Sequence, residues 1–170
     1  MNVIGLALVP DNSRPHDFRV AISIDGEPLT ERVRRVEAPY RHEAGGEPPA
    51  TRYQWVAAGL LLLPSRHLVG PSASPWSDWL LGLSEVLVCT CGEAACGSIG
   101  VAVRVWPEHV GWLAWRQFPL AESDPRCEFR TLVFRRAQYE AELERVSAEY
   151  RRTIVAHRTA AERDRTVQRH

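Results

Sequence analysis

The chain has 170 residues, of which 45% are hydrophobic and 25% are charged, and its acidic and basic residues cancel. This composition is ordinary for a globular protein and excludes a disordered chain or a fibrous repeat. The length suits a single domain that buries a core without needing a disulfide framework. The longest apolar run, residues 56–64, is too short to span a bilayer, so we predict no membrane association.

Two strands are predicted at the start of the chain. Residues 2–9 are apolar but lack the basic residues of a signal peptide, and Asp11 follows almost at once. Over residues 17–25, apolar and polar side chains alternate with the period of a half-buried strand. Because residues 11–15 are typical turn residues, we expect the two strands to form a hairpin.

The next forty residues are less regular. We predict a short helix over residues 31–37, with Thr30 as its N-cap and Pro39 ending it. Residues 38–50 are rich in Gly, Pro and Glu and are predicted to be an exposed loop. Residues 51–63 fit either a short helix or a buried strand, and periodicity does not decide between them.

The middle of the chain predicts an antiparallel meander of three strands, over residues 85–91, 99–106 and 109–118. In the second strand, one face is apolar and consists of Ile99, Val101, Val103 and Val105. A short strand over residues 131–134 is expected to join the meander.

A long helix is predicted from Arg136, because apolar residues recur at helical spacing: Tyr139, Leu143, Val146, Tyr150 and Ile154. We therefore predict an α+β fold, in which an antiparallel sheet (N-terminal hairpin plus central three-stranded meander) packs against a long C-terminal helix. Residues 1–155 form its single domain, and residues 156–170 form a basic helix end or tail.

The last twenty residues are basic, with six arginines against Glu162 and Asp164. A solvated helix end explains this most simply, and an arm for nucleic acid or an acidic partner is the alternative. We expect no nucleic acid, because the arginines alternate with acids and no aromatic residue follows Tyr150.

Three of the four cysteines lie within eight residues: Cys89, Cys91 and Cys96. Such a cluster is typical of metal or redox chemistry in a reducing cytoplasm, not of a secreted disulfide scaffold. Cys89 and Cys91 are two apart on a strand and share a face, and Cys96 follows a turn that returns toward it. Three thiolates suit zinc, with His67 as the favoured fourth ligand and His109 or Cys127 as alternatives.

Two other interpretations of the cysteines stay open. They are buried small hydrophobic residues, or two of them form a reactive redox pair. A catalytic triad of Ser65, His67 and Asp78 is a third arrangement, but the sequence around Ser65 has no nucleophile-elbow pattern.

The predicted meander also carries three tryptophans. Strand alternation puts Trp112 on the face of Val110 and Ala114, and Trp115 on the opposite face. An exposed member of the group that includes Trp106 would anchor a partner. Packing against the C-terminal helix is the commoner fate of such residues.

Four segments together resemble a family of small uncharacterised proteins found largely in actinobacteria: residues 63–70 (LPSRHLVG), 86–96 (VLVCTCGEAAC), 111–118 (GWLAWRQF) and 133–143 (VFRRAQYEAEL). Some members of that family carry an oxidoreductase label. The resemblance implies that His67 lies near Cys89, Cys91 and Cys96.

This chain departs from the family pattern in three places. Ala95-Cys96-Gly97-Ser98 stands where the family has Gly-Cys-Trp-Pro, and Pro119-Leu-Ala-Glu replaces a Pro-His-Arg stretch. A function that depends on that His-Arg pair is therefore not expected here. Arg135 occupies the position of an Asp, which removes a helix N-cap.

The sequence favours a non-enzymatic intracellular module that binds a protein partner and has a zinc-thiolate turn. The alternatives are a thiol-dependent redox protein that uses Cys89, Cys91 or Cys96, and a nucleic-acid binder that uses the arginine tail.

Overall fold

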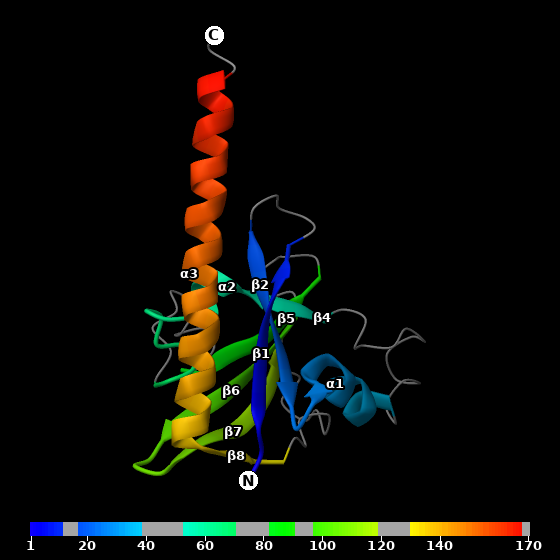
Figure 1. Cartoon of the computed structure of the whole chain (residues 1–170). Coiled ribbons are helices and arrows are strands. Elements are labelled where there is room, and N and C mark those ends of the chain that lie inside the picture. Colours follow the sequence, from blue (N-terminus) through cyan, green and yellow to red (C-terminus); the bar gives the residue numbers. More distant parts are fainter. Residues whose placement is uncertain (12–16, 39–52, 71–81, 91–96, 119–129, 168–170) are drawn as a thin grey trace.

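The computed structural model describes residues 1–11, 17–38, 53–70, 82–90, 97–118 and 130–167 (Figure 1). Its elements, in chain order, are β1 (Ile4–Pro10), β2 (Phe18–Ile24), β3 (Glu27–Pro28), α1 (Leu29–Glu37), β4 (Tyr53–Ala57), α2 (Ala58–Leu61), β5 (Ser84–Cys89), β6 (Ser98–Val105), β7 (His109–Phe118), β8 (Leu132–Arg135) and α3 (Arg136–Val167). Eight strands form one sheet in the order β1-β2-β4-β5-β6-β7-β8, with β3 paired to β2. The predicted α+β fold is confirmed.

The N-terminal hairpin and the central meander form as predicted, and β8 joins the meander beside β7. What the sequence left open is the link between them. Residues 51–63 contain both alternatives, because β4 is followed directly by α2. β4 pairs with β5 through Tyr53–Trp55 and with β2 through Val56 and Ala57, so it joins the hairpin to the meander in one sheet.

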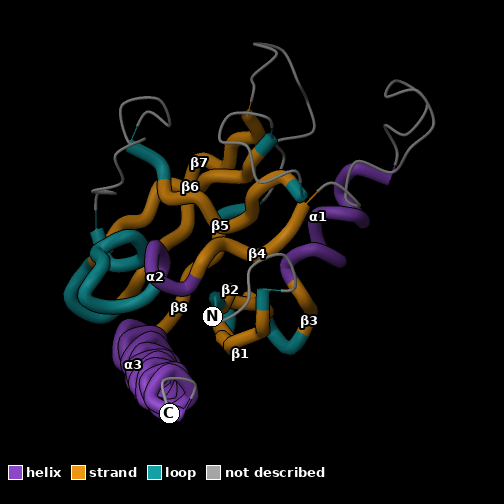
Figure 2. Tube along the Cα trace, turned by 90° about the horizontal axis from the view of Figure 1, so that it is seen from above, coloured by secondary structure: helices purple, strands orange, loops and turns teal. Residues whose placement is uncertain are grey.

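The two ends of the sheet meet at Asn2. Asn2 forms an isolated parallel bridge with Phe134 of β8, and its backbone N–H donates to Val133 O at 2.7 Å. The Asn2 side chain also donates to Asp25 at the turn after β2, at 2.7 Å. The long helix α3 packs against β1 and β8, the two strands at the ends of the sheet, as the view from above shows (Figure 2).

The apolar stripe of α3 faces the core, as predicted. Tyr139, Leu143 and Val146 are buried, while Tyr150 and Ile154 further along the helix are partly covered. None of the helices in the described residues has the length and apolar character that a membrane crossing needs.

The predicted start of α1 was wrong. The helix begins at Leu29, so Thr30 lies inside the first turn and Pro28 occupies the N-cap position without a side-chain hydrogen bond. The reason is that Pro28 ends β3, which pairs with β2, and Leu29 enters the core at once. Tertiary packing sets this boundary in place of the capping side chain.

The predicted faces of the tryptophans were also wrong. Trp112 and Trp115 are both buried in the same core, with ring centroids 5.7 Å apart. The β6–β7 register shifts between Gly100 and Ala102, and Ala114 has a left-handed φ of 45°. This β-bulge adds a residue to β7 and reverses the alternation after it.

Candidate functional site

The segment from Pro64 to Gly70, here called the His67 segment, is held by hydrogen bonds from the rest of the fold just before its start and at its centre. Just before it, Leu63 N donates to the Ser147 hydroxyl of α3 at 3.0 Å. Further on, the Tyr139 hydroxyl donates to Leu68 O at 2.9 Å, and the Ser84 hydroxyl of β5 donates to His67 O. These bonds satisfy backbone groups that would otherwise be buried without partners.

His67 is buried with 4% of its surface exposed, and its Nε2 lies 2.8 Å from the backbone oxygen of Glu85. Because a carbonyl oxygen only accepts, Nε2 carries the proton and the lone pair is on Nδ1. Burial lowers the pKa of His67, and the bond to Glu85 opposes this shift only in part. The ring is therefore neutral near pH 7.

Ser65 does not form a nucleophile–base pair with His67. Its hydroxyl donates to Leu60 O at 2.7 Å and accepts the backbone N–H of His67 at 3.2 Å. The single hydroxyl proton is thus committed to Leu60, and the imidazole Nε2 is committed to Glu85. Asp78, the third residue of the considered triad, lies outside the described residues.

Cys89 is the last residue of β5, and it is buried with 8% of its surface exposed. It pairs with Tyr53 of β4, and the Gln54 side chain donates to its backbone oxygen at 2.7 Å. Val88 of β5 pairs with Ser98 of β6, so Cys89 lies at the end of β5 next to the start of β6. Cys91, Cys96 and Cys127 lie outside the described residues, and in the rest of the chain no group of three or more metal-ligating side chains comes together.

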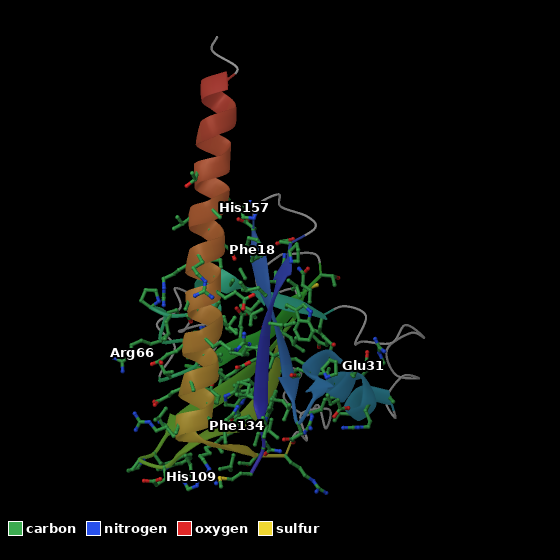
Figure 3. All side chains as sticks on the ribbon, in the orientation of Figure 1. Phe18, Glu31, Arg66, His109, Phe134 and His157 are labelled. Atoms are coloured by element: carbon green, nitrogen blue, oxygen red, sulfur yellow. The ribbon has the colours of Figure 1, made fainter. Side chains whose placement is uncertain are left out.

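The two histidines considered as fourth ligands lie away from Cys89. His67 is bound at Glu85, four residues earlier on β5, or roughly 13 Å along the strand. His109 begins β7 at the end of the sheet where Val105 pairs with Val110, whereas Cys89 is near the Ser98 end of β6. Figure 3 shows His109 at the same end of the molecule as Phe134.

Trp106 follows β6 and is the most exposed of the described tryptophans of the meander, at 46%. Its ring rests on Gly111 of β7, where an added Cβ would come within 2.7 Å of the six-membered ring. The sequence holds two signals for an exposed ring here: turn residues follow Trp106, and Gly111 in the next strand leaves room for the ring. An exposed tryptophan was considered, but neither its identity nor its neighbours were predicted.

No family model, no curated protein and no solved structure matches this chain. The resemblance to the actinobacterial family therefore stays a prediction, and function is argued from the geometry alone.

Proposed function

We propose that this protein is a non-enzymatic intracellular binding module whose β5–β6 connection contains a structural zinc ion. The observation that supports a binding role is that the hydroxyl groups around His67 are all hydrogen-bonded to the backbone. Ser65, Ser84 and Tyr139 all donate their hydroxyl protons to backbone oxygens, so these side chains fix the His67 segment in place. Groups committed in this way support the fold and are not free to transfer protons to a substrate.

The zinc part of the proposal rests on donor chemistry and on the place of Cys89. Cys89, Cys91 and Cys96 would supply three thiolates from one short connection, and tetrahedral thiolate sites suit zinc. When bound, the metal would cross-link the connection and stabilise the fold. His67 is the proposed fourth ligand, with Cys127 as the alternative, and the backbone oxygen that His67 Nε2 contacts belongs to Glu85, four residues before Cys89 on β5.

Elemental analysis of the untagged protein tests this proposal. We expect about one zinc per chain, and chelation should lower the melting temperature. Cys89→Ser should reduce the zinc content sharply, whereas His109→Ala should leave it unchanged. A protein purified with reduced cysteines, without metal and insensitive to chelation contradicts the zinc site.

The two alternative classes predict different results. A redox protein should contain a thiol that alkylates rapidly in the native state, and the burial of Cys89 makes that residue a poor candidate. A nucleic-acid binder should bind more weakly as salt rises and should lose binding when residues 151–170 are removed.

A further inference from the structure

Trp106 lies on the outer face of the sheet. Val110 and Trp112 of β7 point into the core, so Gly111 between them faces outward, and the Trp106 ring rests against it. Leu113, two residues on, comes within 3.5 Å of the same point. The Gly111 backbone thus supports a large aromatic ring that remains half exposed.

Other apolar side chains are exposed at the same end of the molecule. Six large hydrophobic residues are exposed in the described part of the chain, and three of them lie here: Met1, Val3 and Trp106. The bridge from Asn2 to Phe134 brings Met1 and Val3 beside β8, whereas Val105 pairs with Val110 and points to the opposite face of the sheet. Exposed apolar residues that gather in one place mark an interaction site more often than scattered ones do.

Two arginines lie on the same face of the sheet as this ring. Arg104 pairs with Gly111 across β6 and β7, and Arg135 pairs with His109 across β7 and β8. Both arginines are exposed, and within the described ranges neither has an ion-pair partner. By contrast, the neighbouring Arg136 is already paired with Glu140 at 2.7 Å.

We propose that this Trp106 surface, formed by Trp106, Leu113, Val133, Arg104 and Arg135, binds an acidic peptide segment of a protein partner. An apolar or aromatic side chain of the peptide would pack on Trp106, and its carboxylates would pair with the two arginines. Tryptophan and arginine are the residues that most often dominate binding energy at protein interfaces. This inference rests on the proposed binding role and names the partner class.

Two observations favour a peptide over nucleic acid. Among the described residues, the surface has one exposed ring flanked by aliphatic side chains, whereas single-stranded nucleic acid is bound by several aromatic rings in a basic groove. Residues 1–150 also carry four more acids than bases, because the last twenty residues hold six arginines against two acids. That net charge repels a polyanion but tolerates a short peptide with a few carboxylates.

Selection of displayed 12-residue random peptides on the full-length protein tests the inference. We expect the enriched peptides to combine Asp or Glu with Trp, Phe or Leu. Trp106→Ala should weaken the selected peptides at least about tenfold, as expected for the removal of a central aromatic anchor. Arg104→Glu with Arg135→Glu should weaken them as well, and this loss should shrink as salt rises.

Two further variants separate the surface from the fold. Gly111→Ala keeps Trp106 and both arginines but forces the ring to move, and it should weaken binding in a protein with unchanged circular dichroism. Arg66→Glu changes an exposed arginine away from this surface and should leave binding unchanged.

Other outcomes would overturn the inference. Selected peptides that bind all variants equally would place the partner elsewhere and leave the binding role intact. Binding of an oligothymidine that is lost in Trp106→Ala would make the ligand nucleic acid. Self-association lost in the same variant would make it a second copy of the chain. A selection with no enriched peptide would count against both this inference and the proposed binding role, whereas the zinc measurement is independent of it.

Discussion

Tyr139 connects three parts of the fold through one hydroxyl group. The hydroxyl accepts the indole N–H of Trp112 at 3.1 Å and donates to Leu68 O at 2.9 Å. It therefore joins α3 to β7 and to the His67 segment inside a fully buried environment. Burial also raises the pKa of Tyr139 far above its usual value, so the hydroxyl is a neutral donor near pH 7.

Tyr139→Phe should destabilise the protein by about 3 kcal/mol, because it leaves a buried indole N–H and a buried carbonyl without a partner. Urea denaturation followed by tryptophan fluorescence measures this change. Tyr150→Phe is the matched control, since within the described part of the chain its hydroxyl has no hydrogen-bond partner, and it should be nearly neutral. Equal losses in the two variants would show that the Tyr139 bonds contribute little.

His67 should make stability depend on pH in a defined window. The pKa of His67 is lowered in the folded state from its usual 6.5, so near and just below that pH the unfolded chain binds a proton that the folded protein does not. The contribution of His67 to the unfolding free energy is therefore fully present above about pH 6.5. It falls as the pH drops toward the folded pKa, by at most about 1.4 kcal/mol per pH unit.

His67→Gln tests this dependence, because the glutamine amide can still donate to Glu85 O but does not titrate. We expect the fall in unfolding free energy between pH 7 and pH 5 to become shallower. An unchanged slope in His67→Gln would mean that His67 is protonated in the folded state.

At the scale of elements, α3 covers the outer edge of β1 with polar side chains. The Gln138 amide donates to Ile4 O at 3.0 Å, the Leu6 N–H donates to Glu142 at 2.8 Å, and Arg145 donates to Leu6 O at 2.7 Å. Residues at positions i, i+4 and i+7 of a helix share one face, so their spacing matches alternate residues of the strand. An edge covered in this way cannot pair with another chain.

Glu142→Ala should destabilise the protein by about 2 kcal/mol, because it removes a charged acceptor from Leu6 N–H and from Arg145. It should also raise the tendency to associate through β1, which light scattering detects at high protein concentration. Glu144→Ala, on the exposed side of the same helix, is the control and should change neither quantity. A stable, monodisperse Glu142→Ala protein would show that β1 needs no covering.

Elements whose pattern is local could be predicted from the sequence. Two-residue alternation identified the hairpin and the meander, and three-to-four-residue spacing identified α3 and its buried face. The face of Trp115 could not be predicted, since it depends on a bulge at Ala114 that no local pattern marks. Strand β4 could only be given as one of two alternatives for a similar reason, because its partner strands β2 and β5 are distant from it in sequence.

The candidate site was less predictable than the fold. The resemblance implies that His67 lies near the cysteines, and this stays a prediction because Cys91 and Cys96 lie outside the described residues. The structure shows that the His67 ring is bound to Glu85 of β5. That contact depends on how the His67 segment folds back on β5, which no spacing in the sequence specifies. Trp106 and its two arginines are separated by up to 31 residues in the chain, so their proximity follows only from the β6–β7–β8 register.

At the scale of the whole molecule, α3 is both part of the core and an extension beyond it. Phe18 at the start of β2 packs against Tyr150 and His157 of the helix, with ring centroids 6.5 Å and 5.5 Å apart. Beyond these contacts the helix runs on past the sheet (Figure 1). Figure 3 shows Phe18 and His157 together at the point where it leaves the body.

Removing residues 158–170 should therefore leave stability almost unchanged, with a melting temperature within about 2 °C of the wild type, the shift that roughly half a kcal/mol produces in a protein of this size. Removing residues 150–170 should lower it by considerably more, because Phe18 then loses both rings and Tyr150 no longer packs against the core. Differential scanning calorimetry compares the two truncations under the same conditions. Equal changes in melting temperature would show that the folded body extends along the helix beyond His157 and that the basic end belongs to the fold. If the changes differ as expected, residues 158–170 contribute little to stability and are free to serve another purpose.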